Sequence, residues 1–381
     1  MIVLAAPRFG FHGGVERHVH DLAIGLRSRG HRVALVYAPN ERGRDVETYM
    51  RAFDVVAPLE RATHLFAQAS VVYAHKVEDA ALFDAVPSST RLVLAVHDHD
   101  LTCVRSHRYL PVTGEPCERA PGVGCVAHGC VVVRARGSRC GVALRDPFAR
   151  ARQTRELARR ALLVACSAFV RRTLIDAGIS ADRVRALNPV PPDDRDPVLP
   201  APREPVIGFI GQIIRGKGLD LLLDAVAKIP KAKLVVAGTG NGLDQARVQI
   251  ARLGMSGRVE LLGAVAPSEV RAIYDRVRVV AVPSRWPEPF GMIGVEAMRR
   301  GRVVVGARHG GIPEWLEDGV TGIAFNPGDV DDLAKALSLA LFGSEYEAMA
   351  AAGSARARAR FSFAHMLDHV EAVLGVAAKA A

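Results

Sequence analysis

The feature that most constrains the fold is a regular alternation along almost the whole chain. Short runs of Val, Leu, Ile and Ala alternate with stretches in which apolar residues recur at helical spacing. Strands that alternate with amphipathic helices are typical of parallel sheets covered by helices. We therefore predict an α/β fold of open, doubly wound parallel sheets. The expected strands are residues 2–6, 32–38, 71–74, 92–96, 162–166, 206–210, 233–237, 258–262, 277–282 and 303–305.

Between these strands, the same spacing predicts helices and some of their caps. One helix follows Gly14 and ends before Gly30, and Ser167 is the expected N-cap of another. The remaining helices are expected to start near residues 219 and 242 and to include residues 268–274, 295–300 and 365–374.

The alternation is interrupted by a proline-rich segment at residues 188–205. Proline supports neither a helix interior nor a central strand, so this segment is read as a linker. A chain of 381 residues also exceeds the size at which one hydrophobic core usually stops growing. We predict two Rossmann-like domains with a binding cleft between them, and a last helix that could cross back onto the first domain. The expected bounds are 1–190, linker 191–204, 205–360 and last helix 361–381.

Composition and net charge restrict where the protein is expected to reside and which classes of partner it could bind. Apolar residues make up 49% of the chain, and no run reaches the roughly 20 apolar residues of a membrane span. The first residues lack the pattern of a signal peptide, so we expect a cytoplasmic protein. The net charge of +10 indicates an anionic partner. Nucleic acid is not expected, because aromatic residues are only 6% of the chain and no recognised binding module appears.

Arginines crowd one stretch of the first half of the chain. They could form a solvated helix face, or a docking surface for a pyrophosphate-linked acceptor or for anionic lipid at the inner face of the membrane. Both readings stay open. The arginines are Arg134, Arg136, Arg139, Arg145, Arg150, Arg152, Arg155, Arg159 and Arg160.

In the second domain, polar and glycine-rich loops follow the expected strand ends, where ligands bind in parallel sheets. The loop at residues 211–218 contains Arg215 and Lys217 at the start of a helix, a position that suits a diphosphate. The loop after the next strand begins with Gly238. A plain turn between strand and helix is the alternative interpretation of the loop at residues 211–218.

Two glutamates frame the segment Glu288-Pro-Phe-Gly-Met-Ile-Gly-Val-Glu296. Glu288 lies in the loop after a strand, and Glu296 lies inside the helix that follows. We expect Glu288 to face a sugar and Glu296 to face a ribose.

With these motifs, nearly the whole chain resembles the family-4 retaining glycosyltransferases of GT-B architecture. In that family an E-x7-E pair binds the nucleotide sugar, which implies contacts of Glu288 with sugar hydroxyls and of Glu296 with the ribose diol. Lys217 matches the lysine that compensates the charge of the departing diphosphate. The family has an arginine where this chain has Gln212, so Arg215 is the candidate to replace that guanidinium. The implied backbone contacts to the donor are at Phe290, Gly291, Met292 and Ile293.

The first domain carries two further matches to the family. Gly13 and Gly14 begin a G-G-x-E-R motif, whose glycine amides approach the donor diphosphate in the family. His97 follows an expected strand at the position where family members place a histidine beside the transferred sugar. The resemblance thus implies His97, Lys217 and Glu288 as catalytic residues, without a protein nucleophile or a catalytic metal ion.

An insertion at about residues 98–145 breaks the alternation and holds most of the cysteines. Clustered cysteines in a reducing compartment suggest a structural zinc site, with buried thiols and disulfides as alternatives. Because the insertion begins beside His97, it is also a candidate lid over the acceptor. The candidate zinc ligands are Cys103, Cys117, Cys125 and Cys130.

Together these observations predict a retaining hexosyltransferase. Its donor would be a UDP- or GDP-linked sugar, and its acceptor a hydroxyl of a glycan, a lipid-linked compound or a small molecule. The alternatives are an epimerase or phosphorylase that keeps the donor site, and a two-lobed binding protein without chemistry. A nicotinamide-dependent oxidoreductase is disfavoured, because neither domain contains G-x-G-x-x-G after its first strand.

Overall fold

A computed structural model describes residues 1–38, 43–76, 80–135, 141–192, 198–266 and 268–377. The chain forms two compact units. Unit 1 comprises Met1–Ser106, Glu118–Pro192 and Phe363–Ala381, and unit 2 comprises His107–Cys117 and Asp193–Ser362. Part of the expected linker, Arg136 and Arg139 of the arginine-rich stretch, and the last four residues lie outside the described residues.

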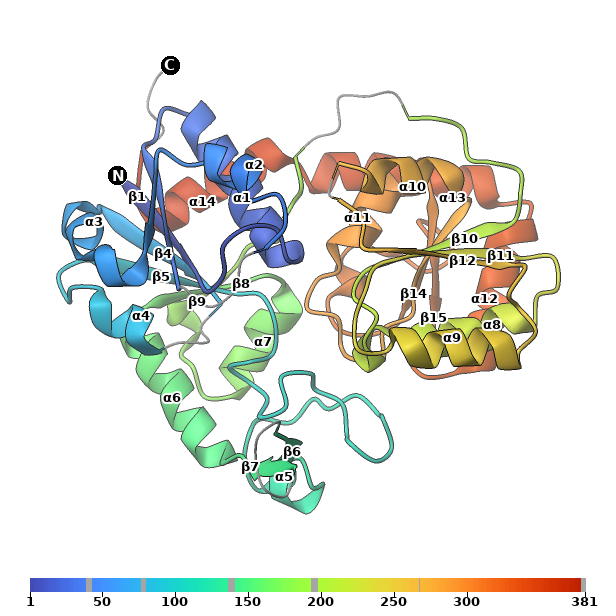
Figure 1. Ribbon diagram of the computed structural model, residues 1–381, viewed down its shortest axis with the longest axis horizontal. Helices are drawn as coiled ribbons and strands as arrows, with labels where there is room; N and C mark the ends of the chain where they lie inside the picture. Colours follow the sequence, from blue (N-terminus) through green and yellow to red (C-terminus); the bar gives the residue numbers. More distant parts are fainter. Residues whose placement is uncertain (39–42, 77–79, 136–140, 193–197, 267, 378–381) are drawn as a thin grey trace. The chain divides into compact units, whose positions relative to one another are not determined.

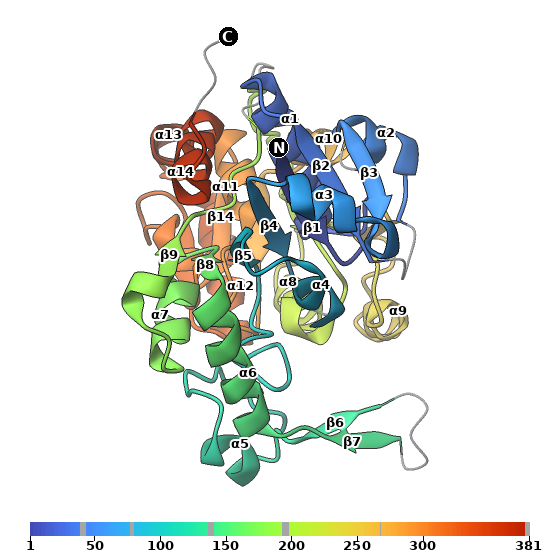
Figure 2. The same ribbon diagram turned by 90° about the vertical axis from the view of Figure 1, so that its left-hand side faces the viewer.

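Unit 1 is built on a seven-stranded parallel sheet with the order β3-β2-β1-β4-β5-β8-β9 (Figures 1 and 2). The strand order reverses between β1 and β4, which is the switch point where open parallel sheets bind ligands. Five of these strands were expected from the sequence; the edge strands β3 and β9 were not. The strands are β1 Ile2–Ala6, β2 Val33–Tyr37, β3 Val55–Pro58, β4 Val71–His75, β5 Arg91–Val96, β8 Leu162–Ala165 and β9 Val184–Ala186.

The helices of unit 1 confirm both caps that the sequence predicts. Gly30 follows the first helix with φ 80°, and the Ser167 hydroxyl accepts a hydrogen bond from the backbone of Val170 at 3.0 Å. The helices are α1 Gly14–Ser28, α2 Val46–Arg51, α3 Thr63–Gln68, α4 Ala80–Ala85, α6 Pro147–Arg160, α7 Ala168–Asp176 and α14 Phe363–Leu374, with 3-10 turns at Leu59–Arg61 and Ala181–Arg183.

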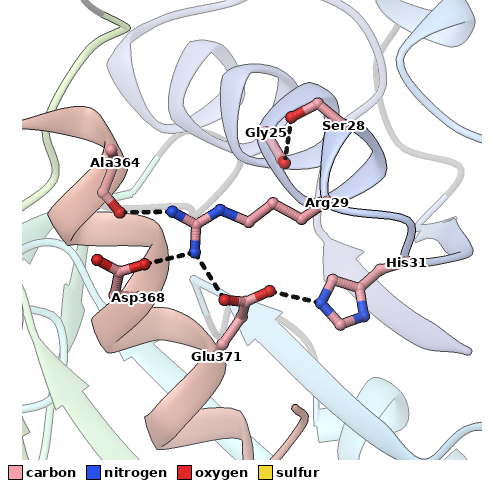
Figure 3. A network of polar contacts seen from close by, with 7 residues as sticks. All are labelled: Gly25, Ser28, Arg29, His31, Ala364, Asp368 and Glu371. Carbon is pink, nitrogen blue, oxygen red and sulfur yellow. Dashed lines mark hydrogen bonds and ion pairs between the residues drawn. The ribbon is translucent and has the colours of Figure 1, made fainter. Parts of the chain in front are cut away.

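A polar network fastens α14, the last helix of the chain, to the end of α1 within unit 1 (Figure 3). The Arg29 guanidinium donates to Asp368 at 2.7 Å and to Glu371 at 2.6 Å. His31 shares a 2.6 Å hydrogen bond with the second oxygen of Glu371, which is only 5% exposed. A buried carboxylate with two partners of this kind specifies where the helix docks.

The insertion is divided between the units. In unit 1 it forms α5 Val123–Ala127 and an antiparallel hairpin of β6 Val132–Arg134 and β7 Val142–Leu144, which extends away from the main sheet (Figure 2). The segment His107–Cys117 instead clusters with unit 2. This division differs from the expectation that the whole insertion belongs to the first domain.

Unit 2 is built on a six-stranded parallel sheet with the order β12-β11-β10-β13-β14-β15. Its order reverses between β10 and β13, and its edge strand β15 was not expected from the sequence. The strands are β10 Val206–Ile210, β11 Lys233–Ala237, β12 Val259–Gly263, β13 Val279–Val282, β14 Val303–Ala307 and β15 Ile323–Phe325. The helices are α8 Leu219–Ala227, α9 Leu243–Arg252, α10 Val270–Arg276, α11 Met292–Arg299, α12 Val330–Phe342 and α13 Tyr346–Arg360, with 3-10 turns at Arg215–Lys217 and Ile312–Glu314.

None of the helices in the described part of the chain has both the length and the apolar character needed to cross a bilayer.

Candidate functional site

A buried polar side chain with several partners in unit 2 is the Glu288 carboxylate, in the loop after β13. Its Oε1 lies 2.6 Å from the Lys217 ammonium. Its Oε2 accepts hydrogen bonds from the Ser284 hydroxyl at 2.7 Å and from the Trp286 indole N–H at 2.8 Å. The residue is only 5% exposed. The structure thus brings together two of the predicted catalytic residues, Lys217 and Glu288.

The ionised form of Glu288 is favoured by these contacts. Burial by itself raises the pKa of a carboxyl group, but the charge of Lys217 and the hydrogen bonds from Lys217, Ser284 and Trp286 outweigh it and lower the pKa of Glu288 below 4.5. The site therefore holds a buried carboxylate beside an ammonium group.

Backbone contacts hold Lys217 and Glu288 together. The carbonyl of Gly216, in the loop after β10, accepts hydrogen bonds from the amides of Arg285 at 2.9 Å and Trp286 at 3.2 Å. Gly218 follows with φ 71°, and a Cβ on it would lie 1.9 Å from the Pro283 carbonyl oxygen. Only glycine allows the two loops to approach this closely.

The loops after β10 and β11 are joined in the same way. The Gly211 amide donates to Ala237 at 2.9 Å, and the Ile213 amide donates to Thr239 at 2.8 Å. Gly238 has φ 147°, and a Cβ there would lie 1.8 Å from the Gly211 carbonyl oxygen. The structure thus places Gly238, a predicted donor contact, directly against the loop that leads to Lys217.

A third glycine turn supports Glu288 from behind. The Gly311 amide donates to the Glu288 carbonyl at 2.7 Å, and a Cβ on Gly310 would lie 2.4 Å from that carbonyl oxygen. His309 shares a 2.8 Å hydrogen bond with the carbonyl of Ser284. The sequence shows this turn as His309-Gly310-Gly311 after β14, but not that it packs against Glu288.

The second glutamate of the pair lies inside α11, which begins after Gly291 at Met292. Glu296 is 8% exposed, and its Oε2 accepts a hydrogen bond from the Tyr274 hydroxyl at 2.7 Å.

Phe290, one of the predicted backbone contacts to the donor, packs its ring against Phe361 at 5.7 Å between centroids. Its side chain is therefore part of the core, so that a donor could meet only its backbone.

Arg215, the candidate substitute for the family's arginine, is exposed. Its guanidinium lies near Gly114 of the insertion segment that clusters with unit 2. Its role as a diphosphate ligand stays a prediction.

In unit 1 the predicted glycines lie at the start of α1. Gly13 is the N-cap residue in extended conformation, and α1 begins at Gly14 without a capping side chain. Backbone N–H groups at such a helix start favour anions. Glu16 of the same motif is buried, at 5% exposure.

His97 lies just after β5 in a cluster of three histidines. The His75 Nδ1 and His97 Nε2 atoms are 3.0 Å apart, and the His18 ring lies 5.5 Å from that of His97. Burial, with the charges of His18 and Lys76 opposing protonation, lowers the pKa of His97 to about 3. Burial lowers the pKa of His18 to about 4. The cluster is neutral at physiological pH, and neither His75 nor His18 was singled out by the sequence.

Next to His97, two carboxyl groups share one lysine. Lys76 lies 3.5 Å from Asp98 and 3.8 Å from Asp100. Burial and the charge of Asp100 raise the pKa of Asp98 to about 7, against the opposing effect of Lys76. The end of β5 therefore holds a carboxyl group that titrates near neutral pH.

The cysteines of the insertion belong to both units: Cys117 lies in unit 2, whereas Cys103, Cys125 and Cys130 lie in unit 1. The Cys130 amide donates to the Cys125 carbonyl at 2.8 Å. Among the described residues, no three His, Cys, Asp or Glu side chains form a group that could hold a metal ion. The zinc site stays a prediction.

Two family profiles match consecutive parts of the chain. "Glycosyltransferase Family 4" matches residues 12–190, and "Glycosyl transferases group 1" matches residues 192–356. The chain is 35% identical over 194 residues to a D-inositol 3-phosphate glycosyltransferase of Mycolicibacterium smegmatis, covering 50% of this chain and 42% of that protein. A protein of the same name from Mycobacterium sp. (strain KMS) is 41% identical over 138 residues, covering 35% of this chain and 31% of that one. The chain thus spans less than half the length of the curated relatives it matches.

Solved structures match the whole architecture. The Anabaena protein HepE, in complex with UDP and glucose, superposes with a TM-score of 0.76 at 22% identity, covering 98% of this chain and 99% of that one. A sucrose-phosphate synthase from Thermosynechococcus elongatus gives a TM-score of 0.70 at 18% identity, covering 98% of each chain. At this level of identity the likeness shows the fold alone. With two parallel-sheet units and both family profiles matched, the chain belongs to glycosyltransferase family 4 and has the GT-B fold.

Proposed function

We propose that the protein is a retaining glycosyltransferase. Its donor is a hexose linked to UDP or GDP, and its acceptor is a hydroxyl of a glycan, a lipid-linked compound or a small molecule. The observation that carries this proposal is the contact of the Lys217 ammonium with the Glu288 carboxylate, 2.6 Å apart at the carboxyl edge of the unit 2 sheet. A cation suits a diphosphate, and a carboxylate suits sugar hydroxyls. HepE, of the same fold, has been crystallised with UDP and glucose and with UDP-glucose.

The proposed reaction needs no protein nucleophile and no metal ion. The bond between the sugar C1 and the diphosphate oxygen breaks, and the acceptor oxygen bonds to C1 on the same face. The acceptor proton passes to the departing phosphate oxygen. Lys217 and the backbone N–H groups at the start of α11 stabilise the negative charge that develops on the leaving group.

Donor binding in this proposal exchanges partners around Lys217 and Glu288. In the structure the two groups satisfy each other, together with Ser284 and Trp286. A diphosphate takes over Lys217, and the sugar hydroxyls then donate to Glu288. Both charges are thus positioned before the donor arrives, and little reorganisation is needed in the transition state.

A thermal-shift screen with UDP, GDP, ADP and their sugar conjugates tests the donor site. A nucleotide sugar present at about 100 times its Kd stabilises the folded state by about 2.7 kcal/mol. We expect Glu296→Ala to weaken nucleotide binding by about tenfold, the value of one lost hydrogen bond to a charged group. His97→Ala is expected to spare donor binding and lower transfer.

Glu204→Ala is the matched control for Glu296→Ala, because Glu204 pairs only at the surface with Lys233, at 68% exposure. The donor site is contradicted if none of the nucleotides raises Tm. The division of roles is contradicted if Glu296→Ala and His97→Ala lose binding and transfer equally. Release of free hexose-phosphate or an epimerised donor would favour the alternative chemistries.

We also propose that the insertion of unit 1 contacts an anionic membrane. The pairing of β6 with β7 places Val132, Leu144 and Val142 on one face of the hairpin, and Leu144 is 80% exposed. The neighbouring helix α6 carries five arginines and one glutamate. Exposed apolar side chains beside arginines fit the interface of a bilayer that contains anionic lipid. The other exposed apolar residues nearby are Val123, Val126 and Phe148.

Vesicle cosedimentation tests this surface. We expect binding to phosphatidylcholine vesicles that contain phosphatidylglycerol, weaker binding in high salt, and little binding to phosphatidylcholine alone. Leu144→Asp is expected to reduce binding, whereas Val248→Asp, at a position of α9 in unit 2 that is 69% exposed, is the control. Equal binding of both variants, or binding that ignores lipid charge, would contradict the proposal.

A further inference from the structure

His75 is a buried histidine that no predicted role includes. It is the last residue of β4, and its neighbour in the parallel register is Ala95 of β5, two residues before His97. The residue is 0% exposed. Its Nδ1 lies 3.0 Å from the His97 Nε2, and the two ring planes differ by only 18°. The two imidazoles therefore share one hydrogen bond close to the plane of both rings.

One of the two rings must donate this hydrogen bond, and the surroundings of His75 decide which. Its Nε2 is buried and has no hydrogen-bond partner among the described residues. If His75 carried its proton on Nε2, a buried N–H group would be left without an acceptor. With the proton on Nδ1, the Nε2 atom is a bare acceptor without a donor, and unpaired buried acceptors are commoner in proteins than unpaired buried N–H groups. A proton on Nδ1 instead makes the bond to His97. His75 is thus the donor, and the His97 Nε2 is the acceptor.

This assignment fixes the proton of His97 as well. Burial, with His18 and Lys76 nearby, lowers the pKa of His97 to about 3, so its ring carries a single proton at neutral pH. The ring nitrogen that accepts from His75 must be bare, which leaves the proton on Nδ1. Within the described residues, this Nδ1 has no hydrogen-bond partner in the protein. The residue as a whole is half-buried.

We propose that His75 is a positioning residue that holds His97 in its Nδ1–H tautomer, so that His97 serves glycosyl transfer as a hydrogen-bond donor and not as a general base. This inference rests on the proposed role of His97 beside the transferred sugar. The bare nitrogen of His97 is occupied by His75, and the other nitrogen already carries the proton. His97 therefore donates to a sugar oxygen, while the acceptor proton leaves with the phosphate.

The tautomer can be measured without any turnover, on the full chain labelled with 15N-histidine. Long-range 1H–15N correlation distinguishes a protonated, pyrrole-like nitrogen from a bare, pyridine-like nitrogen in each ring. We expect His97 to show pyrrole-like Nδ1 and pyridine-like Nε2 at neutral pH, with its signals assigned by their loss in His97→Gln. A pyrrole-like Nε2 in the wild-type protein would overturn the proposal.

Two substitutions of His75 separate its hydrogen bond from its packing. His75→Phe keeps an aromatic ring but donates nothing, so we expect the tautomers of His97 to mix. His75→Asn places an amide N–H close to the original Nδ1 and should restore the Nδ1–H form. Unchanged signals of His97 in the phenylalanine variant would overturn the role of His75.

Kinetics with UDP-glucose as donor add the functional test. We expect His75→Phe to lower kcat about tenfold with little change in the KM for UDP-glucose, and His75→Asn to recover most of the loss. If His75 had only a structural role, kcat would fall in both variants, together with their Tm. If the wild-type protein transfers nothing from UDP-glucose, the proposed donor fails, while the NMR result still decides the tautomer.

Discussion

Glu288→Ala is expected to abolish glycosyl transfer and to lower the free energy of unfolding by about 2–3 kcal/mol. The carboxylate is buried and has three donors: Lys217 at 2.6 Å, the Ser284 hydroxyl and the Trp286 indole N–H. Alanine leaves all three without their acceptor. The expected cost is below that of a fully buried ion pair, because the Lys217 side chain is 25% exposed and can regain water.

Glu288→Gln separates the charge from the shape of this side chain. An amide oxygen can still accept from Ser284 or Trp286, but it cannot neutralise the Lys217 ammonium. We therefore expect a smaller loss of stability than for alanine and an equally severe loss of transfer, because both the sugar contact and the balance of charge around the diphosphate depend on the carboxylate.

The stability difference between the wild type and Glu288→Gln should depend on pH. The pKa of Glu288 is lowered in the folded protein, so the carboxylate contributes stability that is fully present above the ordinary value of 4.5. This contribution is lost as the pH falls through the lowered pKa. The difference should therefore be constant near neutral pH and shrink in acid; a difference that grew in acid would contradict the ion pair.

Urea denaturation across this pH range measures both effects. Glu204→Ala is the control, because it removes a lysine–glutamate pair at 3.1 Å whose side chains are 57% and 68% exposed. Surface pairs contribute about 0–1 kcal/mol. If the two alanine variants lost the same stability, the buried network around Glu288 would have no special weight.

The parallel sheets could be predicted from the sequence because their central strands are continuous apolar runs. Strand β1 is buried along its whole length, as are β13 and β14. The strands of the two sheets that were missed all lie at sheet edges: β3 is partly exposed, β9 has two exposed residues, and β15 of unit 2 has two half-buried residues. Each of these strands has only three or four residues, so it lacks the longer apolar run on which the prediction rests.

The candidate site could also be predicted only in part from the sequence. Glu288 and Lys217 stand out because each lies in a loop after a strand and matches a family motif. Their contact, 71 residues apart in sequence, depends on how two loops meet. The pairs His75–His97 and Tyr274–Glu296 are each 22 residues apart and join different elements. Nothing in the spacing of these residues indicates such contacts, because they depend on sheet register and helix packing.

Gly218→Ala is expected to cause the second large loss of stability. Gly218 allows the loop that carries Lys217 to lie against the loop that carries Glu288. A Cβ on Gly218 would lie 1.9 Å from the Pro283 carbonyl oxygen, so the two loops would have to separate. The backbone also has φ 71°, which costs an L-residue about 1–2 kcal/mol by itself. With the added cost of the overlap, Gly218→Ala should destabilise the protein by about 2–4 kcal/mol.

Gly254→Ala separates the conformational cost of a positive φ from the cost of the steric overlap. Gly254 has φ 64°, but a Cβ there meets no atom within 4 Å, so only the conformational cost remains. We expect Gly254→Ala to lower the unfolding free energy by about 1–2 kcal/mol and to leave the Tm increase caused by UDP-glucose intact. Gly218→Ala should lower the unfolding free energy and also abolish the Tm increase caused by UDP-glucose. The reason is that separating the two loops draws the Lys217 ammonium away from the Glu288 carboxylate. If Gly218→Ala lost no more than Gly254→Ala and still responded to UDP-glucose, the close approach of these loops would not be what forms the donor site.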